Sequence, residues 1–300
     1  MDQTPPMIPQ ADPGAGYRAQ REEIDAAVAR ALGSGWYILG KEGEAFEREF
    51  AGWLGAARAV GCANGTDALA LILRGMGIGE GATVATVSHT AVATVAAIEM
   101  VGAVPLLLDI DPDTYTMDPD ELAAVLEDPP PGLPPIRAAI AVHLYGQACD
   151  LGPMLAACER AGAALIEDCA QAHGAAIGGR PVGGFGTLGS YSFCQDKIMT
   201  TGGEGGMIVT DDDALFDEIW SFKDHGKDRA LVFQKDPAPG FRWLHAAGPG
   251  TNLRMTAPSA ALGRVQWRRL PEWQAARERN ALQLAAALEG TELLLIPMPP

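Results

Sequence analysis

Short apolar runs alternate with amphipathic helical stretches along most of this 300-residue chain, and that alternation constrains the fold more than any other feature. Residues 83–87, 104–110 and 138–144 are apolar runs of strand length, and the helical stretches 91–101 and 118–126 separate them. Continuous apolar runs indicate strands buried on both faces, and helices between consecutive strands indicate parallel pairing. The sequence therefore predicts an α/β fold in which helices sandwich a mainly parallel sheet.

The same pattern extends in both directions from these segments. It predicts further strands at 58–62, 163–167 and 207–209, and helices at 17–32, 43–54, 66–76, 151–161 and 213–222. In sheets of this kind, ligands bind at the carboxyl ends of the strands. We therefore expect the functional residues directly after the predicted strands.

A change in composition near residue 235 predicts a boundary between two domains. Pro237, Pro239 and Gly240 follow it closely, and clusters of proline and glycine are typical of linkers. We predict a large domain at 1–235 and a smaller, apparently incomplete C-terminal α+β domain at 236–300. The main helix of the smaller domain is expected at 259–283, with a kink or break at Pro271.

Charge and cysteine content limit the class of function. The chain has 22 Lys and Arg against 38 Asp and Glu, a net charge of −16, which argues against nucleic acid or an anionic membrane as the main partner. Residues 1–16 lack the apolar core of a signal peptide, and polar residues interrupt the most apolar stretch, 83–108. The five cysteines form no CxxC pair, so we expect reduced thiols, a cytoplasmic protein and no metal site.

The first candidate site follows the predicted strand at 58–62. Residues 63–69, Ala-Asn-Gly-Thr-Asp-Ala-Leu, form a turn of small residues that runs directly into a helix. Backbone N–H groups at a helix start, with the Thr66 hydroxyl beside them, can bind a phosphate. An ordinary N-cap is the alternative, because Thr66 and Asp67 are both good capping residues.

The second candidate site is a pair of acids, Glu167 and Asp168, directly after an apolar strand. Burial of a carboxylate is costly unless a cation or hydrogen-bond donors face it, and a protonated pyridine nitrogen would be such a partner. A loop acid paired with a local arginine is the alternative. His173, in the same segment, is expected to be a core histidine.

The third candidate is Lys197, which small and apolar residues surround, with a glycine-rich stretch at 200–206 after it. Desolvation lowers the pKa of a lysine, and the neutral amine is a nucleophile that can form a Schiff base. Glycines let the backbone approach closely. A purely structural lysine is the alternative. The polar loop 250–256, Gly-Thr-Asn-Leu-Arg-Met-Thr, is a fourth candidate that says little alone.

These four segments, in this order and spacing, resemble the DegT/DnrJ/EryC1/StrS family of sugar aminotransferases. That family belongs to the fold-type I, aspartate aminotransferase-like enzymes, so the resemblance implies this fold and the cofactor pyridoxal 5'-phosphate. The likeness runs from 35–40, Gly-Trp-Tyr-Ile-Leu-Gly, through 260–263, Ala-Ala-Leu-Gly. Its most specific parts are 167–174 and 192–206.

The resemblance implies roles for three residues around the pyridine ring. Lys197 stands where the family's lysine forms a Schiff base with the cofactor and then moves the proton, so it is the implied catalytic residue. Asp168 stands where a carboxylate keeps the pyridine nitrogen protonated, so that the ring can accept the electron pair released at the substrate carbon. Gln171 matches the residue beside the phenolic oxygen of the cofactor.

The resemblance also implies a phosphate site that two subunits build. Gly65 and Thr66 match the family's phosphate-binding turn, and the Ser192 hydroxyl is expected on the same phosphate. Asn252 matches an asparagine that, in the family, reaches the phosphate from the neighbouring subunit. The implied assembly is therefore a homodimer with shared active sites.

Two features depart from the family pattern. Relatives often have a large aromatic residue stacked on the pyridine ring where this chain has Ala91. His89, two residues earlier, could replace it as a cofactor-binding residue, or the ring face could be covered otherwise. The chain also ends at Pro300, earlier than members of the family usually do, which indicates an abbreviated small domain or a fragment.

The implied reaction moves an amino group from an amino acid, L-glutamate, to a 3- or 4-keto carbon of a nucleotide-linked sugar. Lys197 favours this reaction because relatives with histidine at its position dehydrate sugars instead. The aromatic residues Trp36 and Tyr37 resemble the part that lines the sugar or nucleotide site, although a helix-terminating turn explains them equally.

Two other functions were weighed against this one. A regulatory or catalytically idle homologue that binds pyridoxal phosphate is the alternative function. A Rossmann dinucleotide enzyme is disfavoured, because residues 61–68 lack the GxGxxG turn.

Overall fold

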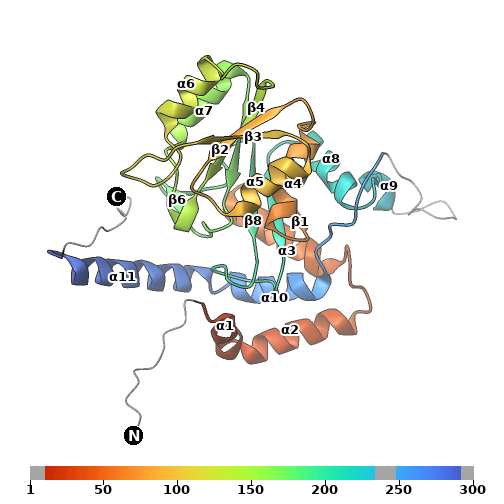
Figure 1. The fold of residues 1–300 in the computed structure, drawn as a ribbon. Helices are drawn as coiled ribbons and strands as arrows, with labels where there is room; N and C mark the ends of the chain where they lie inside the picture. The colour runs from red at the N-terminus through yellow and green to blue at the C-terminus, as the bar shows by residue number, and fades with distance from the viewer. Residues whose placement is uncertain (1–10, 234–247, 292–300) are drawn as a thin grey trace, which may run out of the picture.

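A computed structural model of the chain describes residues 11–233 and 248–291. Its centre is a sheet in the order β1-β9-β8-β5-β4-β2-β3, covered by helices (Figure 1). The strands are β1 (Arg58–Cys62), β2 (Thr83–Val87), β3 (Val104–Leu108), β4 (Ile136–Val142), β5 (Ala164–Asp168), β8 (Leu188–Ser192) and β9 (Gly206–Thr210).

All neighbouring strands from β8 to β3 pair in parallel, whereas β9 is antiparallel to both β1 and β8. A short two-stranded sheet, β6 (Ala176–Ile177) and β7 (Arg180–Pro181), lies between β5 and β8 in the chain. The prediction of an α/β fold with a mainly parallel sheet is therefore confirmed.

Helices connect the strands and cover the sheet. They are α1 (Pro13–Ala19), α2 (Arg21–Gly33), α3 (Lys41–Leu54), α4 (Gly65–Gly75), α5 (Val92–Met100), α6 (Pro119–Glu127), α7 (Leu151–Ala161), α8 (Asp213–Lys223), α9 (Arg229–Val232), α10 (Ala257–Trp267) and α11 (Leu270–Leu288). None of the helices in the described part of the chain is both long and apolar enough to cross a membrane.

The apolar core divides into two clusters on opposite faces of the sheet. Successive residues of a strand point to opposite faces, so Ile208 of β9 joins α4 to α8 in one cluster, whereas Met207 and Val209 face α3 in the other. The second cluster is aromatic, with Phe46 and Phe50 of α3 packed against strand β8. Helix α10 lies between α3 and α2 and packs on both, so α2 forms an outer layer (Figure 1).

The structure differs from the sequence prediction in three places. The helix predicted at 17–32 is two helices, α1 and α2, which meet at Gln20. The helix predicted at 259–283 is also two, because α10 ends at Trp267 and α11 starts afresh with Pro271 in its first turn. Strand β8 was not predicted. The domain boundary near residue 235 stays a prediction, since residues 234–247 lie outside the described ones.

Candidate active site

Five strands bring the predicted site residues to one edge of the sheet. Strands β2, β4, β5 and β8 are parallel, and register pairs Val142 with Asp168 and Asp168 with Ser190. The carboxyl ends of these strands therefore lie side by side. β1 ends at the same edge, because its last residue, Cys62, pairs with Gly206, which also pairs with Ser192. This edge holds the start of α4 and is where a ligand is expected.

The start of α4 lies directly against the end of β8. A Cβ atom added to Gly65 would be 2.6 Å from Cβ of Ser192 and 3.0 Å from its Oγ, so only glycine fits this approach. The N–H groups of Gly65 and Thr66 belong to the first helical turn, which has no internal acceptors for them. The structure thus places Gly65, Thr66 and Ser192 around one helix terminus, as a phosphate site requires.

The N-cap of α4 is Asn64, not Thr66 or Asp67. Its Oδ1 accepts a hydrogen bond of 2.8 Å from the N–H of Asp67, and its Nδ2 donates to the Asp67 carboxylate at 2.6 Å. The turn therefore does contain an ordinary N-cap, but the capping residue is Asn64, and the phosphate site stays a prediction. Since Asn64 does the capping, the Thr66 hydroxyl does not serve as the N-cap.

Asp168 is the buried acid of this edge, at 6% exposure. Its Oδ1 accepts from the N–H of Ala170 at 3.0 Å, and its Oδ2 accepts from the Thr94 hydroxyl at 2.9 Å. Burial raises the pKa of Asp168 above its usual value, although these two donors and the charge of Lys197 act in the opposite direction. A cation bound against this carboxylate would favour its ionised form.

Lys197 lies in a loop that leaves and re-enters the sheet at the same edge. Ser192 at the end of β8 pairs with Gly206 at the start of β9, and the N–H of Phe193 donates to the Gly205 carbonyl at 2.8 Å. The lysine is half-buried, and its charge acts on both Asp168 and His173. The structure therefore brings the amine and the buried carboxylate to one site.

Gln171 is fixed by one end of its amide. Its Oε1 accepts a hydrogen bond of 2.8 Å from the backbone N–H of Tyr145. Because the oxygen is engaged, the NH2 group of the amide is left as the donor end, which is the group that a phenolate oxygen needs. Tyr145 lies three residues after β4, in the short 3-10 turn Leu144–Gly146.

His89, two residues after β2, lies between two tyrosine rings. Its ring is 6.3 Å from that of Tyr115 and 6.0 Å from that of Tyr145, both in edge contacts. Its Nδ1 is buried and makes no hydrogen bond to the described residues. Ala91 is exposed and offers no ring. His89 is thus the aromatic side chain available on this side of the edge, and its contact with the cofactor stays a prediction.

Asn252 differs from the other predicted residues because it is exposed, and its contacts in the described part of the chain are with Arg254 and Asp224. Its Oδ1 accepts from Nε of Arg254 at 2.9 Å, and Arg254 donates in turn to the buried Asp224 at 2.6 Å. The backbone of Arg254 pairs with Cys62 at the end of β1. Among the described residues, the NH2 group of Asn252 has no hydrogen-bond partner, and its contact with a cofactor phosphate stays a prediction.

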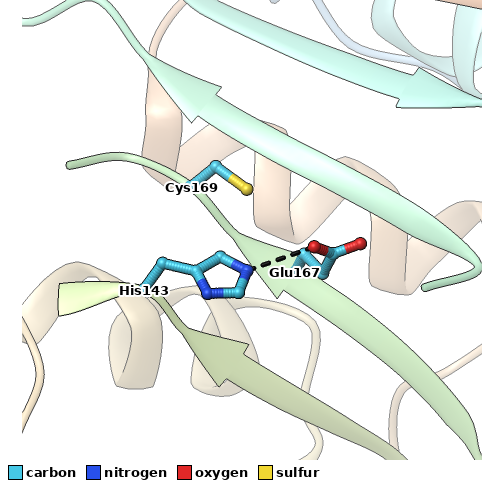
Figure 2. Close-up of side chains that lie close together, drawn as sticks. All are labelled: His143, Glu167 and Cys169. Carbon is cyan, nitrogen blue, oxygen red and sulfur yellow. Dashed lines mark hydrogen bonds and ion pairs between the residues drawn. The ribbon is translucent and has the colours of Figure 1, made fainter. Parts of the chain in front are cut away.

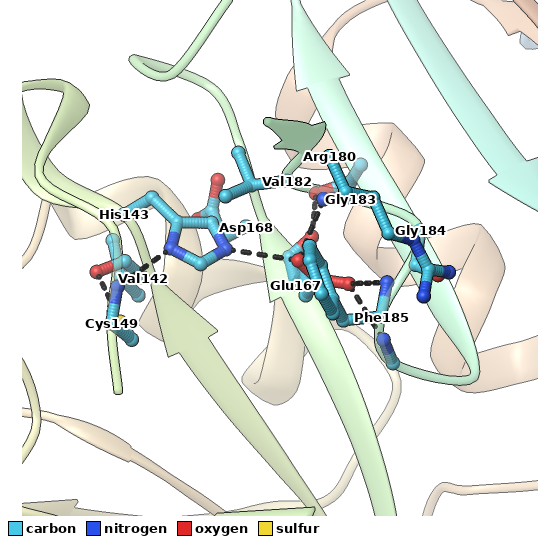
Figure 3. A network of polar contacts seen from close by, with 12 residues as sticks. Val142, His143, Cys149, Glu167, Asp168, Arg180, Val182, Gly183, Gly184 and Phe185 are labelled. Carbon is cyan, nitrogen blue, oxygen red and sulfur yellow. Dashed lines mark hydrogen bonds and ion pairs between the residues drawn. The ribbon is translucent and has the colours of Figure 1, made fainter. Parts of the chain in front are cut away.

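A buried polar network lies beside the site, and sequence patterns did not predict its extent (Figure 3). The Glu167 carboxylate accepts hydrogen bonds of 2.6 Å from each of the backbone N–H groups of Gly183, Phe185 and Gly186. His143 Nε2 lies 3.1 Å from Glu167 Oε2. Because the N–H of Cys149 donates to His143 Nδ1, the imidazole proton must be on Nε2, which donates to Glu167.

The environment of Glu167 stabilises its ionised form. Burial alone would raise the pKa of this carboxyl, but His143 and the N–H groups of Gly186 and Gly183 lower it below its usual value. His143 also donates its backbone N–H to the Asp168 carbonyl at 3.0 Å. The network thereby joins β4 and β5 directly beneath Asp168.

Figure 2 shows that Cys169 completes a group of three residue types that can bind metal. The ligand atoms of His143, Glu167 and Cys169 lie within 4.8 Å of one another. Glu167 and His143 are engaged in the hydrogen bonds just described, and burial raises the pKa of the Cys169 thiol to about 12. Two of the three ligand groups are thus engaged in hydrogen bonds and the third is a protonated thiol at pH 7, and the absence of a metal site stays a prediction.

His173 lies in the core, as expected from the sequence. Its ring packs on Tyr191 and Phe193 on the α3 side of the sheet. Burial, together with the charge of Lys197, lowers the pKa of His173 to about 3, so it is neutral at pH 7.

A surface hollow of about 480 Å³ lies at the opposite edge of the sheet, between the start of β8 and the end of β9. Its acids are engaged: Asp211 accepts from the N–H of Ala57, and Asp212 caps α8. The hollow is therefore not the candidate site.

The residues at the site edge fit pyridoxal phosphate. Asp168 offers a buried carboxylate for a pyridinium nitrogen, and Gln171 offers an amide donor for a phenolate. The start of α4, together with Ser192, offers a phosphate-binding site. Lys197 supplies the amine. Sequence reasoning did not identify Thr94, His143 or Tyr145, because each contacts a residue far away in the sequence and the sequence does not specify these contacts.

Comparison with known proteins supports the same conclusion. The model of the DegT/DnrJ/EryC1/StrS aminotransferase family matches residues 18–300. The chain is 37% identical to the erythromycin biosynthesis sensory transduction protein EryC1 of Saccharopolyspora erythraea, over 97% of this chain and 74% of that protein. It is 36% identical to a UDP-N-acetyl-3-dehydro-alpha-D-glucosamine 3-aminotransferase of Acidithiobacillus ferrooxidans, over 97% and 74% of the two chains.

Solved structures of relatives share this fold. An aminotransferase from Psychrobacter cryohalolentis is 42% identical with a TM-score of 0.85, covering 92% of this chain and 69% of that one. DesV of S. venezuelae, solved in complex with a ketimine intermediate, is 35% identical with a TM-score of 0.88, covering 98% and 75%. The predictions of an aminotransferase fold and of pyridoxal phosphate as the cofactor are confirmed: the chain belongs to the DegT/DnrJ/EryC1/StrS aminotransferase family.

Proposed function

We propose that the protein transfers an amino group from L-glutamate to a keto carbon of a nucleotide-linked sugar, in the biosynthesis of amino sugars. The observation that supports the proposal is the position of the buried Asp168 carboxylate at the sheet edge from which the Lys197 loop leaves, close enough for the charge of the lysine to lower the pKa of the acid. Relatives are named as transaminases of UDP- and dTDP-linked sugars, and another is named a GDP-perosamine synthase, which supports the substrate class.

Different residues of the chain are proposed to carry out different steps of this reaction. Lys197 moves the proton at the substrate carbon in both half-reactions, since an amine at this place is a suitable general base. Asp168 holds a proton on the pyridine nitrogen, and Thr94 and Ala170 hold Asp168 in place. The bound cofactor supplies an electron sink and carries the amino group between the two half-reactions.

The keto group is proposed at position 3 of the sugar, with position 4 as the alternative. Relatives named for 3-dehydro and 3-oxo sugars, from Acidithiobacillus ferrooxidans and Pseudomonas aeruginosa, support position 3. Turnover of UDP-linked 3-keto and 4-keto sugars by the pyridoxamine form, followed by mass spectrometry of the product, would decide between them.

The active site is proposed to be shared in a homodimer, with Asn252 reaching the phosphate of the neighbouring subunit. The exposed position of Asn252 and its free NH2 group support this arrangement. Mixing the inactive variants Lys197→Ala and Asn252→Ala should restore activity, because one site of the mixed dimer is then intact. If each variant stays inactive in the mixture while mixed dimers form, the site is not shared.

The central test is spectroscopic. Protein loaded with pyridoxal phosphate should be yellow, L-glutamate should bleach it, and Lys197→Ala should lose the absorbance of the lysine-linked cofactor. The exposed lysine variant Lys41→Ala is the matched control and should keep it. A lysine-linked absorbance that survives in Lys197→Ala would refute the assignment.

A regulatory role is the second candidate, because one relative, from Geobacillus stearothermophilus at 33% identity, is named a pleiotropic regulatory protein. A yellow protein that does not respond to any amino-acid donor would favour that role over transamination.

A further inference from the structure

We propose that the ring of Tyr145 is a substrate-contacting wall of the site, on which the sugar ring of the nucleotide-linked substrate packs. This inference rests on the proposed function and deepens it by naming a specificity-determining residue. It comes from four observations about Tyr145 that the hydrogen-bond network around Asp168 does not explain.

Tyr145 has a strained backbone. It adopts φ 57 and ψ 13, the left-handed region that bulky residues rarely occupy. Glycine would fit the same conformation without cost. A tyrosine therefore persists here at a cost in stability, and strained residues of this kind cluster at functional sites.

The strained backbone has a role, but that role does not need a tyrosine. The N–H of Tyr145 binds the amide oxygen of Gln171, and any residue other than proline would donate the same bond. The side chain must therefore account for the choice of residue. It is 66% exposed, so core packing does not account for it either.

The position of the ring relates it to the reacting atoms. Gln171 is proposed beside the phenolic oxygen of the cofactor, and in pyridoxal the carbon that carries the amino group is attached next to the carbon bearing that oxygen. Because its N–H donates a hydrogen bond to Gln171, we assign Tyr145 to the side of the site where that carbon and the substrate would lie.

The Tyr145 ring does not stand alone, because two other rings pack beside it and extend the aromatic surface. His89 packs edge-on against Tyr145, with ring centroids 6.0 Å apart, and Tyr115 packs on His89 at 6.3 Å. Tyr115 is also left-handed, with φ 60. Two of the four left-handed residues other than glycine in the described chain thus direct aromatic rings to the same histidine.

An exposed aromatic wall suits the sugar ring better than the phosphates. The C–H face of a pyranose is apolar and carries partial positive charge, and the face of an aromatic ring is negative. The phosphates are anionic and would gain nothing from the face of a phenol ring. We therefore assign Tyr145 to the sugar ring of the substrate.

The experiment compares Tyr145→Gly with Tyr145→Phe in the pyridoxamine phosphate form of the protein. The glycine variant keeps the N–H to Gln171 and relieves the strain, whereas the phenylalanine variant keeps the ring. Tyr17→Ala, at an exposed tyrosine of α1, is the matched control. Calorimetry measures binding of dTDP-glucose and UDP-N-acetylglucosamine, and of dTDP and UDP alone.

We expect Tyr145→Gly to bind the nucleotide sugars about tenfold more weakly, while its affinity for dTDP and UDP stays unchanged. Tyr145→Phe and Tyr17→Ala should bind all four probes as the unchanged protein does. The cofactor affinity and thermal midpoint of Tyr145→Gly should be equal to or above those of the unchanged protein.

Two results would overturn this inference alone: nucleotide sugars bound normally by Tyr145→Gly, or an equal loss for the nucleotides without sugar. If the unchanged protein binds neither nucleotide sugar, the proposed function fails and the inference fails with it.

Discussion

The Thr94 hydroxyl donates a 2.9 Å hydrogen bond to Oδ2 of Asp168, across 74 positions of sequence and between helix α5 and strand β5. Thr94 is fully buried, and Thr90 lies 2.8 Å from it, hydroxyl to hydroxyl. Since Thr94 donates to the carboxylate, Thr90 donates to Thr94. The two threonines thus form a short chain that ends on the acid of the site.

Thr94→Val should weaken cofactor binding by about tenfold or more, because a hydrogen bond to a charged group is lost in a buried place. The pKa of Asp168, already raised by burial, rises further without this donor. Binding uses the ionised carboxylate, so the acid limb of the affinity profile should move to higher pH. Titration with pyridoxal phosphate between pH 5 and 8, followed by absorbance, measures both effects.

Thr86→Val is the matched control for that variant. Thr86 is equally buried but donates to the Ile140 carbonyl, away from the site. It should lose stability and keep the cofactor affinity. Equal losses of affinity in both variants would mean that Thr94 acts only through folding.

Gly65→Ala should destabilise the protein by about 1–3 kcal/mol, because the new Cβ would be 2.6 Å from Cβ of Ser192. It should also weaken phosphate binding, since the start of α4 must move away from β8. Gly52→Ala in α3, where a Cβ meets nothing within 4 Å, should instead stabilise by about 0.5–1 kcal/mol. Urea unfolding of the apoprotein and pyridoxal phosphate affinity separate the two contributions.

Glu167→Gln should remove a pH-dependent part of the stability. The pKa of Glu167 is lowered in the folded protein, so its ionised form stabilises the fold above the unfolded pKa of about 4.3, and this contribution is lost as pH falls through the folded pKa. The variant should be less stable by about 3 kcal/mol at pH 7 and should approach the unchanged protein near pH 3. Urea unfolding between pH 7 and 3 tests this; a constant difference at every pH would contradict it.

Arg254→Met should lower the stability by about 3 kcal/mol, because among the described residues it leaves the buried Asp224 with Lys227 as its one remaining ion-pair partner. Arg254→Lys tests the two contacts of this arginine separately. A lysine ammonium can keep the ion pair with Asp224, but it cannot at the same time donate to Asn252 as the guanidinium does. The lysine variant should therefore be nearly as stable as the unchanged protein and bind the cofactor more weakly. Unchanged cofactor affinity in the lysine variant would show that Arg254 does not position Asn252.

Most elements of the sheet could be predicted because their strands are continuous apolar runs. β8 could not, since its sequence, Leu-Gly-Ser-Tyr-Ser, has small polar residues where a buried strand usually has branched apolar ones. The reason is visible in the fold: Gly189 lies against the Gly183 backbone, and Ser192 against Gly65. Close approach of the backbones requires small residues here. Because these residues are not strongly apolar, a hydrophobicity pattern does not identify the strand.

Site residues could be predicted only where the type of a single residue and its neighbours in the sequence indicate a function. Lys197 and Asp168 stand out by their type and setting, whereas Thr94 and His143 are ordinary residues until the order β2-β4-β5 places them beside Asp168. That order depends on packing of the whole domain. The left-handed conformation of Tyr145 also has no sequence signature, because left-handed turns are usually recognised by glycine or asparagine.

The antiparallel entry of β9 has a consequence for local unfolding. Ser192 and Gly206 pair with each other at the two ends of the loop that carries Lys197. The ends of this loop therefore cannot separate while β8 and β9 stay paired. Opening it requires breaking hydrogen bonds between two strands in the interior of the sheet, where opening costs approach those of global unfolding. Amides such as those of Phe193 and Thr201 should therefore exchange with solvent as slowly as those of the core, so the base of the loop that carries Lys197 is expected to be rigid.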